Sequence, residues 1–337
     1  MSTYTWTSPS NIALVKYWGK HGVQLPANPS ISFTLDKCLS QTSLQLVDRE
    51  EERVRFTFEG EERSGFVPKI ETFLDRIGHL APFLQDHTLI IDSENTFPHS
   101  SGIASSASAM SALSMCIASA WADREGQDEP DLKLASEMAR LGSGSACRSV
   151  YGGFTLWGDT EHLERSSDSY AVPLEQIHPD FLTLQDTILL IDEGEKQVSS
   201  TLGHDLMNGH PYARARFDQA HTHIGDMLGL LKDGDFMALA EMIEREALSL
   251  HAMMMSSDPH FMLFKPGSVS VIQRVMEMRS QGLELTFTLD AGANVHLIYP
   301  ESGAQKIMDI VREEFIGYCQ NGAYICDNVG SGPQRVG

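Results

Sequence analysis

The stretch ASSASAMSALSMCIASAW, from Ala104 to Trp121, constrains the fold of this chain more than any other segment. Small and apolar residues dominate it, and Ala, Met, Leu and Ile recur along its length. A segment of this composition suits a buried helix, because small side chains allow neighbouring backbone to approach closely. We therefore predict a helix that packs closely against a sheet.

Periodicity elsewhere in the 337 residues predicts strands mixed with helices in both halves of the chain. Strands are predicted at 5–16, 30–35, 42–49, 52–60, 87–96, 283–292 and 322–332. Helices are predicted at 65–81, 130–142, 205–231, 235–255 and 268–280. This mixture is typical of an α+β protein, and we place two domains at 1–180 and 181–337.

The acidic composition limits the partners that the chain can bind. Its 46 Asp and Glu outnumber its 25 Lys and Arg, and the formal net charge is −21. Such a surface repels nucleic acid and anionic membranes, so we predict neither as a partner. Solubility alone also explains the acidity. A small anionic substrate would need a local positive pocket.

The cysteine and histidine spacings exclude some classes of site. The five Cys are scattered without a CxxC pair, which argues against a disulfide framework and against a cysteine-based zinc site. The 13 His show no HExxH pattern. No apolar run approaches the roughly 20 residues of a membrane helix, and no secretory signal is visible. We therefore predict a cytoplasmic location.

A serine-rich segment, PHSSGIASSASAM, precedes and enters the predicted buried helix at 98–110. A glycine-containing loop that leads into a helix N-terminus presents unpaired N–H groups and the positive end of the helix dipole, which together can bind an anion. Ser105, Ser106 and Ser108 can add hydroxyl groups. The segment is neither a Walker loop nor GxGxxG. An ordinary capped helix with serine turns explains it equally well.

Two other segments carry cations beside small or aromatic residues. In SPSNIALVKYWGK, Lys16, Tyr17 and Lys20 lie close together and could form an anion site or a solvated lysine pair. In GSGSACRS, Arg148 offers a bidentate fork suited to a carboxylate or a phosphate, and Ser143 and Ser145 can add hydrogen bonds. A surface salt bridge is the alternative explanation for Arg148.

One carboxylate stands out near the end of the chain. In TLDAGAN, Asp290 ends an apolar strand and is followed by glycine and small residues. A carboxylate at a strand end over a cleft can act as a catalytic base. Asp beside Gly is also a common turn former. The later VGSGPQ is another Gly-rich segment that could be a plain loop.

These segments occur in a familiar order. NIALVKYWGK, FPHSSGIASSASA, GSGSACRSVYGGF, VSST, TLDAGAN and VGSGPQ span nearly the whole chain. In this order they resemble the diphosphomevalonate decarboxylases of the GHMP kinase superfamily. KYWGK and GSGSACRS are specific to the decarboxylase branch, whereas the serine loop is shared by the wider superfamily.

The resemblance implies a two-domain GHMP kinase fold and an ATP-dependent reaction. The N-terminal domain is expected to be like the second domain of ribosomal protein S5 and the C-terminal domain to be ferredoxin-like, with the active site in the cleft between them. ATP and Mg²⁺ would serve to phosphorylate the 3-hydroxyl of mevalonate 5-diphosphate. Loss of phosphate and CO₂ would give isopentenyl diphosphate in the mevalonate pathway of isoprenoid and lipid metabolism. A homodimer is also implied.

The resemblance also assigns roles to matching residues of this chain. The expected catalytic residues are Asp290 as proton acceptor, Lys16 as charge neutraliser, and Arg148 with Asn11 on the substrate carboxylate. The substrate phosphates would be bound by Tyr17, Lys20, Ser143, Ser145, Ser199 and Ser200. ATP would be bound by Gly102, Ser105, Ser106 and Ser108, with Ser105 or Ser106 contacting Mg²⁺.

Three positions depart from the pattern of the resembled family and leave the substrate open. His21 follows WGK, Thr201 follows VSS, and Ala293 stands after DAG. They lie near expected phosphate or nucleotide contacts. The alternatives are therefore a 5-phosphomevalonate decarboxylase and a mevalonate 3-kinase-like phosphotransferase, the latter disfavoured by Lys16 together with Asp290. A catalytically silent nucleotide-binding member is a further alternative, which the full set of charged site residues disfavours.

Overall fold

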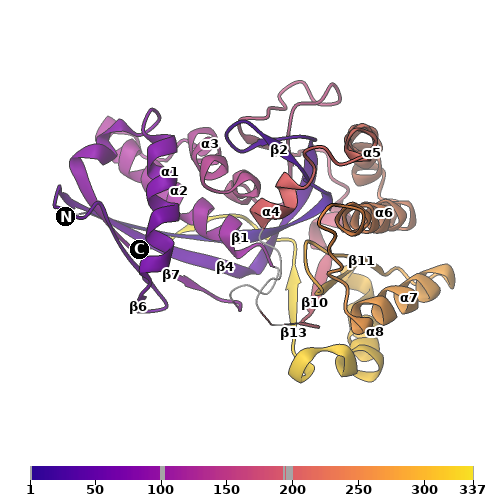
Figure 1. Cartoon of the computed structure of the whole chain (residues 1–337). Helices are drawn as coiled ribbons and strands as arrows, with labels where there is room; N and C mark the ends of the chain where they lie inside the picture. The colour runs from indigo at the N-terminus through magenta and orange to yellow at the C-terminus, as the bar shows by residue number, and fades with distance from the viewer. Residues whose placement is uncertain (1, 99–102, 193, 195–199, 337) are drawn as a thin grey trace.

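The structure is a computed structural model that describes residues 2–98, 103–192, 194 and 200–336, with the backbone alone for Ser200 and Thr201. Two sheets, each covered by helices, organise the described chain (Figure 1). This is the α+β architecture predicted from periodicity, while the boundary at residue 180 stays a prediction. No helix in the described residues combines the length and the apolar composition needed to span a membrane.

The first sheet has eight strands, and its main path runs β14-β1-β4-β7-β5-β6. From β4 a branch leads to β8 and then to β9. The strands are β1 (Thr3–Val15), β4 (Ser30–Asp48), β5 (Val54–Phe58), β6 (Glu61–Glu62), β7 (His87–Asn95), β8 (Phe154–Trp157), β9 (Ala171–Pro173) and β14 (Gln334–Arg335). The helices α1 (Val67–Ile77), α2 (Ser105–Glu125) and α3 (Leu132–Gly142) lie on one face of it (Figure 1).

Helix α2 is the buried helix predicted from its composition. Buried residues occur on all of its sides, and it packs against β1 and β4. Two of its buried serines are hydrogen-bonded to β1: Ser111 accepts from Ser8 Oγ at 2.6 Å, and Ser119 accepts from Trp6 Nε1 at 2.9 Å. Because a buried polar group without a partner costs free energy, these pairs favour one placement of the helix on the sheet.

The second sheet is antiparallel, in the order β11-β12-β10-β13. Its strands are β10 (Gln185–Leu189), β11 (Thr286–Thr288), β12 (Val295–Tyr299) and β13 (Tyr324–Asn328). The helices of this half are α4 (Ser200–Asp205), α5 (Ala213–Asp233), α6 (Phe236–Met255), α7 (Pro266–Ser280) and α8 (Ala304–Ile310). A small hairpin, β2 (Lys20–His21) with β3 (Leu25–Pro26), lies apart from both sheets.

The predicted helix at 205–231 is wrong in its first third. Helix α4 ends at Asp205 and α5 begins only at Ala213. Between them Gly209 has a φ of +78°, and Pro211 follows two residues later. Neither residue suits a helix interior, because Gly costs backbone entropy there and Pro lacks the N–H group that the helix needs.

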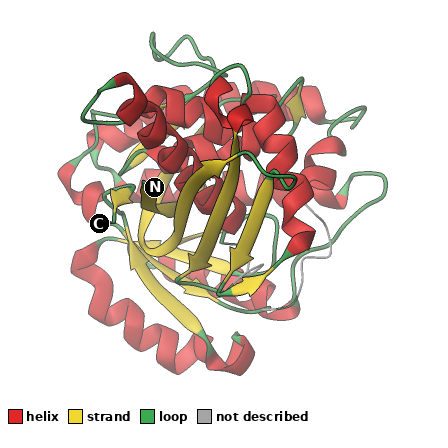
Figure 2. Ribbon diagram, turned by 90° about the vertical axis from the view of Figure 1, so that its left-hand side faces the viewer, coloured by secondary structure: helices red, strands yellow, loops and turns green. Residues whose placement is uncertain are grey.

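The last residues of the chain return to the first sheet. The Gly330 N–H donates to the Thr34 carbonyl at 2.7 Å, and β14 pairs with β1 in antiparallel fashion. The Val336 N–H then donates to the Thr5 carbonyl at 2.9 Å. The two termini consequently lie close together (Figures 1 and 2). The Gly-rich segment VGSGPQ is thus a connection between the two halves and more than a plain loop.

We expect Gly330→Ala to destabilise the protein. A Cβ at this position would lie 2.2 Å from the Leu35 carbonyl oxygen, which belongs to rigid sheet backbone. Relief of such a clash typically costs about 1–3 kcal/mol. The thermal unfolding midpoint of Gly330→Ala should fall by several degrees. The matched control is Gly229→Ala in α5, whose Cβ would meet nothing within 4 Å. Equal midpoints for the two variants would contradict the close approach.

Candidate active site

A cavity of about 430 Å³ lies where the two halves of the chain meet. It brings together ten of the residues expected from the sequence: Asn11, Lys16, Tyr17, Lys20, Ser105, Ser106, Ser143, Ser145, Arg148 and Asp290. Two others, Gly102 and Ser199, lie outside the described residues, and Ser200 is described only as the backbone start of α4. The cavity therefore gathers segments that are scattered over the sequence.

Lys16 and Asp290 form an ion pair at the edge of this cavity. Lys16 directly follows β1, and Asp290 follows β11 after a single residue. The Nζ–Oδ1 distance is 2.9 Å, and the Lys16 side chain is 2% exposed against 27% for Asp290. The carboxylate is thus held beside a buried ammonium, and its side chain is partly exposed in the cavity.

Arg148 lies deep in the cavity, in the 3-10 segment Gly144–Val150. Its Nε donates to Asn11 Oδ1 at 3.1 Å, and its Nη1 donates to Ser30 Oγ. Burial lowers the pKa of Arg148 below its ordinary value. Within the described residues it forms no ion pair with a carboxylate, which excludes the surface salt bridge. A buried guanidinium without a counterion favours an anionic ligand.

The N-terminus of α2 opens into the same cavity. Ala104 has a φ of +47°, and no side chain caps the helix that begins at Ser105. Ser106 Oγ lies 3.2 Å from Ser143 Oγ, so the serine loop and the GSGSACRS segment meet here. Uncapped N–H groups at the start of a 21-residue helix can bind a phosphate. This geometry supports the anion cradle over the simple capped helix.

Ser108, which the sequence places in the expected ATP-binding set, lies apart from the cavity. Its side chain is fully buried and does not line the cavity. Its hydroxyl lies 2.6 Å from Ser40 Oγ and donates to the Ser105 carbonyl at 3.1 Å. One helical turn beyond the open N-terminus, it faces β4 and anchors α2 to the sheet.

A histidine that the sequence did not single out lies at the cationic end of the cavity. His204, in α4, accepts from the Gly19 N–H at 3.0 Å through Nδ1, and its ring centroid lies 4.2 Å from that of Tyr17. Burial, then the charges of Lys20 and Arg148, lower the pKa of His204 to about 3. The ring is therefore neutral at pH 7. Burial is the largest cause of this lowered pKa, and the nearby charges of Lys20 and Arg148 lower it further.

The other end of the cavity is apolar and aromatic, and the sequence analysis missed it. It is lined by Phe56, Phe58, Phe66, Ile70, Met110 and Leu113, together with polar Ser93 and Asn95. Aromatic faces beside a few hydrogen-bonding groups suit a flat heterocycle such as a nucleobase. In the sequence these Phe residues show only the alternation of an ordinary strand and helix.

Comparisons with known proteins assign the chain to a family. The diphosphomevalonate decarboxylase-like N-terminal domain matches residues 8–171, and the mevalonate 5-diphosphate decarboxylase C-terminal domain matches residues 187–334. The chain belongs to the diphosphomevalonate decarboxylase family. The fold is accordingly the two-domain GHMP kinase fold, with an S5-like N-terminal and a ferredoxin-like C-terminal domain, as the resemblance implied.

Relatives within and beside the diphosphomevalonate decarboxylase family cover most of the chain. The diphosphomevalonate decarboxylase of Candida albicans is 30% identical over 92% of this chain and 87% of its own. The phosphomevalonate decarboxylase of Haloferax volcanii is also 30% identical, over 89% of each.

Two solved structures of mevalonate diphosphate decarboxylases have the same fold. The enzyme of Staphylococcus aureus superposes with a TM-score of 0.87 at 33% identity, covering 99% of this chain and 98% of its own. The protein MDDEF in complex with MVAPP, AMPPCP and magnesium superposes with a TM-score of 0.86 at 28% identity, with the same coverage.

Proposed function

We propose that this chain catalyses the ATP-dependent decarboxylation of mevalonate 5-diphosphate to isopentenyl diphosphate, releasing ADP, phosphate and CO₂. The observation that carries the proposal is the content of one cavity. It holds the buried guanidinium of Arg148, which pairs with no carboxylate of the described residues, the Lys16–Asp290 pair and the uncapped N-terminus of α2. The guanidinium can bind a carboxylate, Asp290 can act as a base beside the Lys16 ammonium, and the start of α2 can bind a triphosphate.

The first step is phosphoryl transfer to the tertiary 3-hydroxyl, because hydroxide is a poor leaving group and phosphate a good one. Asp290 accepts the hydroxyl proton. Lys16 Nζ, 2.9 Å from Asp290 Oδ1, neutralises negative charge near the attacking oxygen. The alkoxide oxygen attacks the γ-phosphorus, and the bond to the ADP oxygen breaks.

The second step is elimination. Arg148 and Asn11, joined by the 3.1 Å hydrogen bond, hold the substrate carboxylate in place. The bond between C2 and the carboxylate breaks and releases CO₂. Its electron pair forms the new double bond to C3, and the C3–oxygen bond breaks as phosphate departs. Orientation by a rigid bidentate group keeps the breaking bond aligned with the leaving group.

The nucleotide fits the remaining parts of the cavity. The phosphates lie at Ser105 and Ser106, with Gly102 expected in the same loop, and the base lies against the aromatic end. The MDDEF protein with AMPPCP and magnesium supports ATP and Mg²⁺ as its cofactors. A serine hydroxyl at the helix start and phosphate oxygens are hard donors that suit Mg²⁺. Bound there, Mg²⁺ would neutralise part of the phosphate charge.

The substrate phosphates are proposed to lie at the cationic end of the cavity. Tyr17, Lys20, Ser143 and Ser145 line this region, and Ser199 and Ser200 are expected to join them. The neutral His204 ring closes the same end. This arrangement suits an anion of high charge, and therefore a diphosphate.

The second candidate is decarboxylation of mevalonate 5-monophosphate. It is favoured by the Haloferax volcanii relative, a phosphomevalonate decarboxylase whose identity to this chain, 30%, equals that of the Candida albicans enzyme. His21, Thr201 and Ala293 are the positions that leave this preference open. His21 lies in the hairpin strand that also carries Lys20.

The test separates the candidates by substrate and product. Purified protein is incubated with ATP, Mg²⁺ and either mevalonate, its 5-phosphate or its 5-diphosphate, and CO₂ and ADP are measured. We expect CO₂ and ADP in equal amounts with the 5-diphosphate. CO₂ only with the 5-phosphate would establish the second candidate. ADP without CO₂ would mean a kinase, and no ADP with any substrate would mean a silent member.

We further propose that the protein is a homodimer that acts in the cytoplasm. The five cysteines are free thiols in the structure, and four of them are buried, which suits a reducing compartment. Light scattering of the purified protein should give twice the mass of the chain, and a value equal to the chain mass would overturn the dimer.

A further inference from the structure

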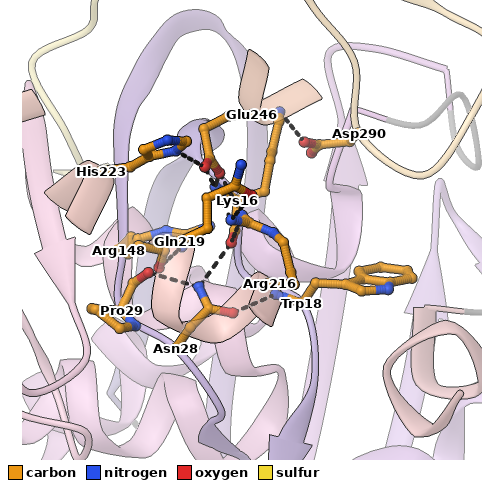
Figure 3. Close-up of polar contacts among 11 residues, drawn as sticks. Lys16, Trp18, Asn28, Pro29, Arg148, Arg216, Gln219, His223, Glu246 and Asp290 are labelled. Carbon is orange, nitrogen blue, oxygen red and sulfur yellow. Dashed lines mark hydrogen bonds and ion pairs between the residues drawn. The ribbon is translucent and has the colours of Figure 1, made fainter. Parts of the chain in front are cut away.

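Lys16 is held by its backbone as well as by its ion pair. Its N–H donates to Glu246 Oε2 at 2.8 Å, and its carbonyl accepts from Arg216 Nη2 at 3.3 Å and from Asn28 Nδ2 at 2.9 Å (Figure 3). Glu246 and Arg216 lie on α6 and α5 of the second half of the chain. The backbone at the end of β1 is therefore hydrogen-bonded to side chains of two helices of the other domain.

Glu246 is the centre of a buried charged cluster. Both Nη atoms of Arg216 donate to its two oxygens, and His223 Nδ1 is hydrogen-bonded to Oε1 (Figure 3). The Glu246 side chain is 0% exposed, as against 1% for Arg216 and 6% for His223. Burial alone would raise the pKa of Glu246, but the hydrogen bond from His223 and the charge of Arg216 outweigh it and hold the pKa below its ordinary value. The carboxylate is thus ionised.

The same helix also holds the other half of the ion pair. His251 lies five residues after Glu246 on α6, and its Nε2 lies 3.1 Å from the Asp290 carbonyl oxygen. Its ring stacks on Phe264 with the centroids 4.0 Å apart and an interplanar angle of 11°. Burial lowers the pKa of His251 to about 4, so the ring is neutral. Because a carbonyl can only accept, Nε2 carries the proton and donates.

A buried ion cluster is a poor way to gain stability, because desolvation offsets most of its attraction. Its geometry here has a clearer use. Helix α6 contacts the Lys16 backbone through one buried side chain and the Asp290 backbone through another. Helix α6 thereby fixes the positions of both backbones, and so the distance between the Lys16 ammonium and the Asp290 carboxylate.

We propose that Glu246 and His251 are positioning residues that set Lys16 against Asp290 and so raise kcat without contributing to substrate affinity. Neither is among the residues that line the cavity. Misplacement of a reacting group by about 1 Å can cost about 10²-fold in rate. The assay of this inference rests on the proposed function, because it needs a substrate that the wild-type enzyme turns over.

The chain offers a matched control for Glu246. Glu244 lies on the same helix, is also buried, and receives two hydrogen bonds from Arg279, at 3.0 and 2.9 Å. It also accepts from Thr286 Oγ1 at 3.1 Å, and it does not line the cavity. Glu246→Gln and Glu244→Gln therefore make the same chemical change in the same helix, and only the first touches Lys16.

We expect Glu246→Gln to lower kcat by about 10–10²-fold while KM and the affinity for ATP stay within about threefold of the wild type. Glu244→Gln should keep the wild-type kcat even if its unfolding midpoint falls by as much as that of Glu246→Gln. An unchanged kcat in Glu246→Gln would overturn the inference, as would equal losses of kcat in both variants. A wild-type protein that turns over none of the three substrates would instead contradict the proposed function.

A second variant keeps the inference testable if Glu246→Gln does not fold. His251→Phe preserves a ring for stacking on Phe264 and removes the N–H that holds the Asp290 carbonyl. We expect a lower kcat at unchanged KM and unchanged ATP affinity. A wild-type kcat in this variant would remove His251 from the proposal, and a rise in KM with no change in kcat would indicate substrate binding instead.

Discussion

We expect Asp290→Asn to lower kcat by about 10²–10⁴-fold, the range associated with loss of a general base. The amide is nearly isosteric with the carboxylate but cannot accept the hydroxyl proton, and it removes the ion pair with Lys16. The backbone carbonyl of residue 290 still accepts from His251, so the local fold should persist.

The measurement combines turnover with nucleotide binding. CO₂ and ADP release should both collapse in Asp290→Asn, while a fluorescent ATP analogue binds with wild-type affinity and the unfolding midpoint stays close to that of the wild type. Near-normal turnover would refute the role of Asp290 as the base. Loss of nucleotide binding would show that the substitution perturbs the site as a whole.

The second large effect is expected for Arg148→Gln, which should lower kcat/KM for the acid substrate by about 10²–10³-fold. Loss of one partner of a buried, hydrogen-bonded charge pair costs about 2–5 kcal/mol in a complex, and the substrate carboxylate is the partner proposed here. The affinity for ATP should change little, because the aromatic end and the start of α2 are untouched.

Stability provides an independent check on Arg148. Within the described residues the guanidinium has no carboxylate partner, so its removal relieves an uncompensated buried charge. The ligand-free Arg148→Gln protein should therefore unfold at a temperature at least as high as the wild type. Arg148→Lys, which keeps the charge and loses the fork, should have an intermediate kcat/KM. An unchanged kcat/KM in Arg148→Gln would contradict the assignment of Arg148 to the substrate carboxylate.

The sequence predicted those features that depend on local composition. Small side chains predicted the buried helix α2. Segments with the hydrophobic period of strands, mixed with segments that have the period of helices, indicated the α+β class. Motif order supplied the expected members of the site, and ten of them line one cavity. Their mutual distances were beyond reach, because Lys16 and Asp290 are separated by 274 residues and meet only through the packing of two domains.

The features that the sequence analysis missed share a physical cause. Glu246 and His251 belong to a helix whose pattern gives no sign that a charged side chain is buried within it. Phe56 and Phe58 alternate as in any strand, so nothing marked them as the lining of a cavity. A serine run also does not indicate which hydroxyl faces the sheet, and here the Ser108 hydroxyl faces β4.

The return of β14 to the first sheet has a consequence for biosynthesis. The hydrogen bond from Gly330 to Thr34 and the pairing of β14 with β1 cannot form until residues 330–335 have left the ribosome. The N-terminal domain therefore leaves the ribosome early, but its sheet is completed only when β14 pairs with β1. A ribosome-stalled chain that lacks residues 329–337 should expose the edge of β1 to proteases, and release of the full chain should protect it.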